Sequence, residues 1–170
     1  DMLVGTLQNI AFVVHGSSSS FPAEVNLQTL NGTNGFRIFG ETVGDRSGET
    51  VAGVGDINGD GIDDIGLGAQ YADPNGASSG KVYLLFGSTG SRAPSLQLGA
   101  LPATAGIAFH GTATEDYCGL NVSRGGDLNH DGGADLLFSC HGASTVGTYR
   151  GATYTIYGER TVVIFKDNLE

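Results

Sequence analysis

Apolar and polar residues alternate in short runs along the chain, and this pattern predicts β-strands. In the central third the predicted strands cover residues 49–55, 62–69, 80–86 and 106–110. Ile65, Leu67 and Ala69 fall on one face of the second, which is typical of a half-buried strand. The connections are rich in Gly, Asn, Ser and Pro, and no segment sustains a 3.6-residue period over ten residues. An all-β protein with almost no helix is therefore expected.

The pattern repeats at a fixed offset of 71 residues. Ile10–Gly16, Lys81–Gly87 and Ala152–Gly158 align at this offset, and Gly48 aligns with Gly119. An offset that is kept through loops of different sequence indicates tandem structural units. Units of four antiparallel strands that stack on their neighbours are typical of β-propeller blades.

The repeat divides the chain into three parts. Residues 1–47 are predicted to hold the last two strands of a partial blade and a linker, residues 48–111 a complete blade, and residues 112–170 a further blade whose last strand covers 161–166. About two and a half blades are fewer than the roughly four to eight of a closed propeller, so the chain is not expected to close by itself. Either it is part of something longer, or other copies of itself cover its exposed ends.

Two nine-residue windows, 56–64 and 127–135, hold seven of the twelve aspartates, and such crowding of charge calls for a cation. In both windows, positions 1, 3, 5 and 9 carry oxygen side chains, and position 6 is glycine, where a sharp turn needs a positive φ. Position 7 offers a backbone carbonyl. Calcium takes about six to eight oxygen ligands, whereas zinc and copper favour His or Cys. The sequence therefore predicts two Ca²⁺ sites, with the ligands Asp56, Asn58, Asp60, Ile62 and Asp64 in the first window and Asp127, Asn129, Asp131, Gly133 and Asp135 in the second.

Two other structures share part of this pattern. An EF-hand shares positions 1, 3, 5 and 6, but its bidentate Glu at position 12 would fall at Leu67 and Phe138, and strands replace its helices. Two ordinary Asp/Asn/Gly hairpin turns are the second alternative. The agreement of every ligand position in both windows favours calcium.

Further residues around the first window form a known pattern, which consists of Phe39-Gly40, Asp45, Gly48, Val51–Gly55, the window 56–64, Leu67-Gly68-Ala69 and Gly80–Gly87. The pattern resembles the FG-GAP repeats of the integrin α-subunit propeller and of related bacterial and algal extracellular proteins. The second repeat matches less well, since it has His110-Gly111 for Phe-Gly and Ser139-Cys140-His141 where Gly-Ala-Pro is usual. The resemblance implies propeller blades with calcium in the hairpin between the first two strands, in secreted or cell-surface proteins that serve adhesion and recognition.

Charge and hydropathy exclude two classes of partner. Eighteen acidic against eight basic residues give a net charge of −10, which leaves little to neutralise a nucleic-acid backbone. The longest apolar runs, Ile10–Val14 and Val82–Phe86, are far shorter than the roughly 20 residues that cross a bilayer, so no membrane insertion is expected.

Cysteines and glycosylation motifs bear on the compartment. Cys118 and Cys140 flank the second window on paired strands, and they either form a disulfide in an oxidising compartment or remain two buried thiols. Two Asn-x-Ser/Thr sequons occur, one at Asn31 in a predicted loop and one at Asn121 inside a predicted strand. Of the two asparagines, only Asn31 is expected to be accessible.

Catalytic constellations are not recognised in the sequence, and the chain is not expected to be an enzyme. The four histidines show no zinc spacing, and no nucleophile elbow or phosphate loop occurs. Asp63 and Asp64 could mimic an acid pair, but adjacent strand residues point to opposite faces, and Asp64 is needed for calcium.

The two windows and the resemblance together imply a calcium-stabilised, extracellular or cell-surface adhesion or assembly module. Its partner would be another protein or further copies of itself, which would give an oligomer or a filament through the incomplete blades. The alternatives are a lectin-like propeller module that binds a glycan, and an accessory module of a larger secreted enzyme.

Overall fold

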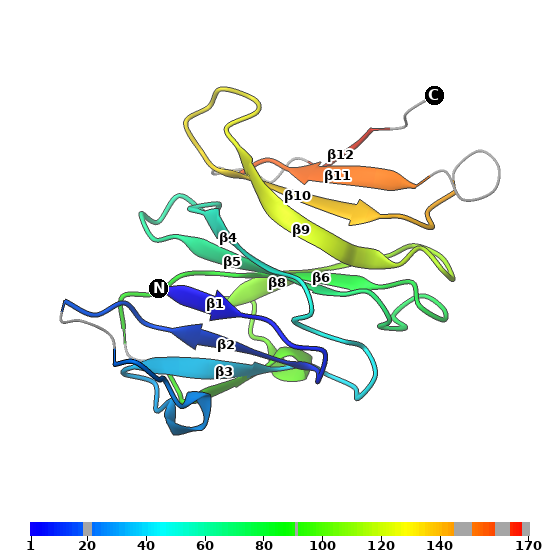
Figure 1. Ribbon diagram of the computed structural model, residues 1–170. Helices are drawn as coiled ribbons and strands as arrows, with labels where there is room; N and C mark the ends of the chain where they lie inside the picture. The colour runs from blue at the N-terminus through cyan, green and yellow to red at the C-terminus, as the bar shows by residue number, and fades with distance from the viewer. Residues whose placement is uncertain (19–21, 91, 145–150, 159–163, 168–170) are drawn as a thin grey trace.

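The computed structural model describes residues 1–18, 22–90, 92–144, 151–158 and 164–167. Within them the chain forms twelve strands and two short 3-10 helices, so the all-β prediction is confirmed. The strands make three four-stranded sheets stacked face to face (Figure 1). No helix in these ranges is long and apolar enough to cross a membrane.

We call the three sheets first, central and third, in chain order. The first sheet contains β1 (Met2–Val4), β2 (Ile10–Val14), β3 (Gly35–Phe39) and β7 (Ser95–Gln97), in that order. The central sheet contains β4 (Val51–Gly55), β5 (Asp64–Ala69), β6 (Lys81–Leu85) and β8 (Gly106–His110). The third sheet runs from β12 (Ile164–Asp167) through β11 (Ala152–Ile156) and β10 (Asp135–Cys140) to β9 (Cys118–Gly126). The 3-10 helices are η1 (Leu27–Thr29) and η2 (Leu98–Ala100).

The predicted strands agree with the observed ones. Those of the central unit are β4, β5, β6 and β8, with ends that lie up to two residues further in. The two strands predicted in residues 1–47 are β2 and β3, to which β1 and β7 are added. The strand predicted at 161–166 corresponds to β12, although residues 161–163 lie outside the described ranges.

One strand crosses from the central unit to the first sheet. β7 belongs to the connection between β6 and β8, but it pairs in parallel with β3, from Arg37 opposite Ser95 to Phe39 opposite Gln97. All other strand pairs are antiparallel. Because β7 is continuous in sequence with β6 and β8, its hydrogen bonds to β3 anchor this connection of the central unit to the first sheet.

β6 has a continuous apolar run because it lies in the central sheet, which is covered on both faces. Val82 and Leu84 point into the core shared with the third sheet, and Tyr83 and Leu85 point into the core shared with the first. All four side chains are at most 2% exposed. A strand covered on both faces has no solvent side, so its sequence does not alternate.

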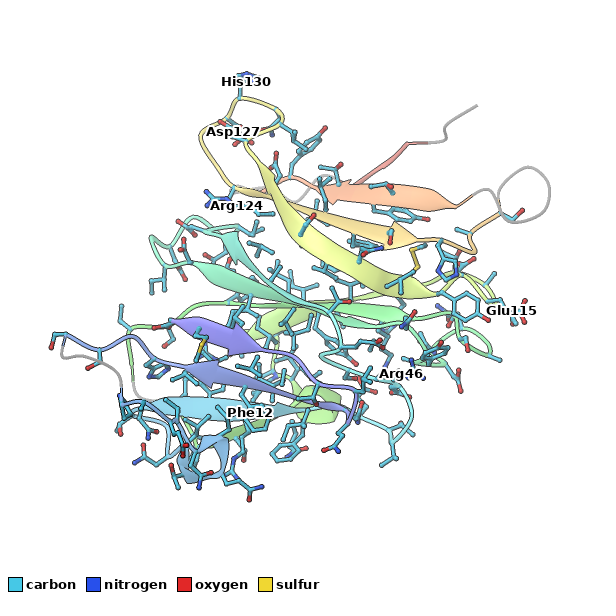
Figure 2. All side chains as sticks on the ribbon, viewed as in Figure 1. Phe12, Arg46, Glu115, Arg124, Asp127 and His130 are labelled. Carbon is cyan, nitrogen blue, oxygen red and sulfur yellow. A yellow bond between two sulfur atoms is a disulfide. The ribbon has the colours of Figure 1, made fainter. Side chains whose placement is uncertain are left out.

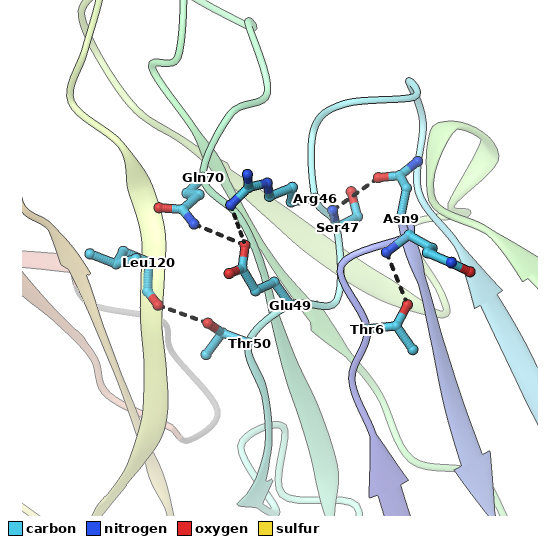
Figure 3. Close-up of polar contacts among 9 residues, drawn as sticks. Thr6, Asn9, Arg46, Ser47, Glu49, Thr50, Gln70 and Leu120 are labelled. Carbon is cyan, nitrogen blue, oxygen red and sulfur yellow. Dashed lines mark hydrogen bonds and ion pairs between the residues drawn. The ribbon is translucent and has the colours of Figure 1, made fainter.

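Close packing of the central and third sheets depends on glycines in β5. A Cβ atom on Gly66 would lie 2.6 Å from Cγ1 of Val122, and one on Gly68 would overlap the carbonyl oxygen of Gly119. The Thr50 hydroxyl also donates to the carbonyl oxygen of Leu120 in β9, over 2.7 Å (Figure 3). Within the described ranges the three sheets form an open stack and not a ring, in agreement with the prediction of partial blades.

Two questions left by the sequence are answered in the third sheet. Cys118 and Cys140 lie opposite each other on β9 and β10 and form a disulfide, so the second alternative, free thiols, does not apply. The expectation that Asn121 is inaccessible is wrong. Asn121 does lie in a strand, but within the described ranges no other sheet covers its side of the third sheet, and it is exposed.

Candidate functional site

The two aspartate windows form hairpin connections at the same end of neighbouring sheets. The first joins β4 to β5, and the second joins β9 to β10. Figure 2 shows the second loop, with Asp127 and His130, projecting beyond the sheets. Residues of both loops line one groove of about 610 Å³, so the loops lie side by side.

In the first loop the acidic side chains accept hydrogen bonds from the backbone of the same loop. Oδ1 of Asp56 accepts from the Asp60 amide over 3.0 Å, and Oδ2 accepts from the Gly61 amide over 2.8 Å. Oδ1 of Asn58 accepts from the Asp60 amide over 3.1 Å, and Oδ1 of Asp60 accepts from the Ile62 amide over 2.9 Å. Gly61 takes the predicted positive φ, 86°. The backbone of the loop is therefore held by hydrogen bonds to its own side chains at positions 1, 3 and 5.

The second loop repeats these bonds one for one. Asp127 accepts from the amides of Asp131 and Gly132, over 3.0 and 3.1 Å. Oδ1 of Asn129 accepts from the Asp131 amide over 3.3 Å, and Oδ1 of Asp131 accepts from the Gly133 amide over 2.7 Å. The two loops differ in sequence at positions 2, 4, 7 and 8. The shared bonds thus depend on the positions that the windows have in common.

The aspartates at position 9 are buried at the base of each loop, where Asp64 is 1% and Asp135 0% exposed. The Asp64 carboxylate accepts from the amides of Ile57 and Gly87, over 2.9 and 2.7 Å. Asp135 accepts in the same way from Leu128 and Gly158, over 2.6 and 3.0 Å. Burial raises the pKa of Asp64, although the hydrogen bonds from Gly87 and Ile57 act in the opposite direction. Each position-9 carboxylate therefore ties the start of its loop to the turn that follows β6 or β11.

The structure brings positions 1, 3 and 5 together within each loop and sets position 9 deeper. The Asn58 amide nitrogen donates to Oδ2 of Asp60 over 2.9 Å, and Asn129 makes the same bond to Asp131. Across the described ranges, no group of three or more His, Cys, Asp or Glu side chains is arranged to hold a metal ion. The donor set nevertheless suits a hard cation, because each carboxylate oxygen that accepts one amide keeps a second lone pair.

Arg124 is a residue of this site that the sequence did not indicate. It lines the groove between the loops together with Asp56, Asp63 and Asp127, and Figure 2 shows it at the base of the second loop. Its guanidinium lies against the backbone of Gly55, since a Cβ there would be 3.2 Å from Cζ. A single arginine in a strand carries no spacing signal, so only the fold reveals that it stands between two acidic loops.

A second group of side chains gathers at the opposite end of the sheets. The Arg46 guanidinium lies 4.8 Å from the centre of the Tyr71 ring, and Tyr71 meets Tyr117 edge-on at 5.9 Å. Tyr117 in turn stacks on His141 at 4.8 Å. We call these four residues the aromatic row. Arg46 and Tyr117 are 71 residues apart, and both adopt a positive φ, 54° and 50°, which is unfavourable for a long side chain.

Comparison with known proteins agrees with these features. The FG-GAP repeat family model matches residues 47–85, which contain the first aspartate loop. Integrin alpha-E of Mus musculus is 35% identical over 106 residues, which is 59% of this chain and 8% of that protein. Integrin alpha-IIb of Homo sapiens is 32% identical over 106 residues, 62% of this chain and 9% of its own length. Integrin alpha-PS5 of Drosophila melanogaster is 36% identical over 110 residues, 63% of this chain and 10% of its own length.

The chain spans about a tenth of the length of these relatives. The likeness is therefore to part of an integrin α subunit and not to the whole. The resemblance predicted from the residues is therefore confirmed: residues 47–85 match the FG-GAP repeat, and the chain is similar to part of integrin α subunits.

Proposed function

We propose that the chain is a calcium-stabilised, extracellular or cell-surface FG-GAP module that serves adhesion or assembly and has no chemistry of its own. In this proposal residues 48–111 and 112–170 are two such blades, and residues 1–47 belong to a partial one. The observation that carries the proposal is the bond-for-bond agreement of the two aspartate loops. Similarity to integrin α subunits supports the adhesive role and a protein partner.

The expected ligands are the oxygens predicted from the sequence: Asp56, Asn58, Asp60, Asp64 and the Ile62 carbonyl, then Asp127, Asn129, Asp131, Asp135 and the Gly133 carbonyl. Calcium would supply the positive charge that offsets the repulsion among the carboxylates of each loop. The loop amides hold these oxygens in place beforehand, so binding stabilises the folded state and not the unfolded chain. Affinities of extracellular calcium modules, about 10⁻⁴ to 10⁻³ M, match the calcium available outside cells.

Thermal unfolding with and without calcium tests the proposal. The wild-type chain should melt at a clearly higher temperature in millimolar calcium than in EDTA, because calcium at about ten times its Kd adds roughly 1.4 kcal/mol per site to the free energy of unfolding. Asp60→Asn and Asp131→Asn each remove one ligand charge and should each abolish part of the calcium-dependent rise.

Asp63→Asn is the matched control. Asp63 is an exposed acid of the same loop at position 8, which is not among the expected ligands. Its substitution should leave the calcium response intact. Equal melting temperatures of the wild type in calcium and in EDTA would sink the proposal.

The aromatic row favours a second candidate function, carbohydrate binding. Tyr71 and Tyr117 are half-buried, His141 and Arg46 are exposed, and together they form a continuous set of planar groups. Sugars stack on such groups in many proteins, and the strained φ values at Arg46 and Tyr117 are of the kind found at functional sites. Saturable binding on a glycan array that Tyr117→Ala removes would support this function, and silence on the array would leave the adhesion or assembly role.

A further inference from the structure

The face of the central sheet that packs against the third sheet can be compared with the equivalent face of the third sheet, because the two units are related by an offset of 71 residues. On the central sheet, one face lies under the third sheet. Val82 and Leu84 are part of the shared core, Ala52 packs against it, and Thr50 donates to the carbonyl of Leu120. Gly68 approaches the backbone of Gly119. All five of these residues therefore contact the third sheet.

In the third sheet the five equivalent positions are all polar. They are occupied by Asn121, Ser123, Ser139, Thr153 and Thr155. Alternation places them on the opposite side from Val122 and Phe138, which are buried in the core. The Asn121 amide lies 3.4 Å from the Ser139 hydroxyl, so these two side chains share a face. We call this the outer face of the third sheet.

The outer face also lacks the glycines that let two sheets pack closely. Gly66 and Gly68 let the third sheet approach the central one, but their equivalents are Leu137 and Ser139. A further sheet could not approach the third sheet as closely as the third approaches the central sheet. Polar residues without a covering sheet keep their hydrogen bonds to water, as in the capping units of repeat proteins. The outer face is therefore a surface that meets solvent.

A complete sequon lies on this face. Asn121 and Ser123 point outward and are exposed, whereas Val122 between them is 6% exposed and fixes the orientation of the strand. We propose that Asn121 is an acceptor of an N-linked oligosaccharide. This inference rests on the extracellular setting of the proposed function, because the modification takes place in a secretory compartment.

The transfer uses a polyprenyl-diphosphate-linked oligosaccharide as its donor. A bond forms between Nδ2 of Asn121 and C1 of the first sugar, and the bond from C1 to the diphosphate oxygen breaks. The polyprenyl diphosphate leaves with the electron pair of that bond, and the amide nitrogen gives up one proton. The finished glycan would stand on the outer face and keep further sheets away from it.

Mass spectrometry of secreted protein tests the proposal. The chain is produced behind a secretion signal in insect cells, as wild type, Ser123→Ala and Thr33→Ala. Ser123→Ala removes the sequon at Asn121 but keeps the asparagine, and Thr33→Ala is the matched control in the other sequon. Intact masses are compared before and after treatment with peptide N-glycosidase, which converts an occupied Asn121 to Asp. Melting in calcium and in EDTA is measured on the same samples.

We expect Ser123→Ala to lose one glycan mass and Thr33→Ala to keep the glycan on the peptide that contains Asn121. Glycosylated wild type and Ser123→Ala should melt at the same temperature, because the glycan stands on a solvent face. Secreted wild type with an unmodified Asn121 peptide would overturn the proposal, and so would a glycan that lowers the melting temperature markedly. The calcium response is read separately, so a failure of the proposed function is distinguishable from a failure of this one.

Discussion

Gly68 shows how strongly single residues are constrained where two sheets meet. A Cβ atom at this position would overlap the carbonyl oxygen of Gly119, which belongs to a rigid backbone. Gly53 lies one strand away in β4, and a Cβ there would meet nothing within 4 Å. Gly68 is therefore buried against the next sheet, whereas Gly53 is exposed.

Gly68→Ala should therefore lower the free energy of unfolding by about 3 kcal/mol, as expected when a packed contact is overfilled. Gly53→Ala should be neutral or stabilising by about 0.5 kcal/mol, because alanine reduces the freedom of the unfolded chain. Urea unfolding measures both. Equal effects of the two substitutions would contradict the packing described for β5.

At the residue scale, the sequence predicted the loops better than their surroundings. The side chains at positions 1, 3 and 5 gather as the spacing implies, because the loop amides that hold them are local. The hydrogen bond from the Gly87 amide to Asp64, and the placing of Arg124 between the loops, depend on contacts between distant segments. No local pattern reports such contacts, and the pairing of the cysteines was left open for the same reason.

At the scale of elements, a polar contact joins the first and central sheets. Glu41, just after β3, accepts from the Tyr83 hydroxyl and from the Lys81 ammonium of β6, each over 2.7 Å. Burial alone would raise the pKa of Glu41. The bonds from Lys81 and Tyr83, with the charges of Lys81 and His110, outweigh it and lower the pKa.

This contact predicts a pH dependence of stability. A carboxylate whose pKa is lower in the folded than in the unfolded state contributes stability above its ordinary pKa and loses it as the pH falls through the folded value. Nearby Asp45 acts with the opposite sign, since burial raises its pKa. The free energy of unfolding of Glu41→Gln should therefore fall less steeply on acidification than that of the wild type, and Glu24→Gln, at an exposed site, should follow the wild type. Parallel acid profiles of wild type and Glu41→Gln would contradict the contact.

The disulfide acts on the strand pair β9 and β10. It closes a loop over a separation of 22 residues that contains the whole second window. Restricting the unfolded chain over such a loop stabilises by about 3 kcal/mol. Replacing Cys118 and Cys140 together by Ala should lower the free energy of unfolding by that amount and leave calcium stabilisation in place. A double variant as stable as the wild type would show that the bond is dispensable.

Most strands were predictable, because alternation and turn residues are local signals, but the pairing of β7 was not. Its three residues, Ser95–Gln97, carry no period, and the parallel ladder with β3 arises only when the connection after β6 folds back over the first sheet. β1 was missed because it is equally short.

The whole molecule has two unlike ends. Phe12 lies in β2 at the position equivalent to Tyr83, which is fully buried, yet Phe12 is only partly covered (Figure 2). The outer face of the third sheet is mainly polar instead, with Leu137 as an apolar residue among Asn, Ser and Thr side chains. Self-association through incomplete blades should therefore use the first sheet alone, and it should stop at a dimer because the other end does not complement it.

Light scattering in calcium and in EDTA measures the oligomeric state of the chain. We expect a dimer that Phe12→Ser dissociates, whereas Leu137→Ser, on the outer face of the third sheet, leaves the mass unchanged. A monomer under both conditions would exclude self-association, and larger species that grow with concentration would contradict a closed pair.

The parallel ladder between β7 and β3 has a mechanical consequence. Pulling the first and central sheets apart strains the connection that holds β7, and with it the main-chain hydrogen bonds that pair Arg37–Phe39 with Ser95–Gln97, in addition to the side-chain core. The central and third sheets share no such ladder in the described ranges, and between them the backbone offers a single bridge from Gly80 to Cys118 and a few scattered bonds. Under tension the stack should therefore yield first between the central and third sheets, while the first two sheets move as one body.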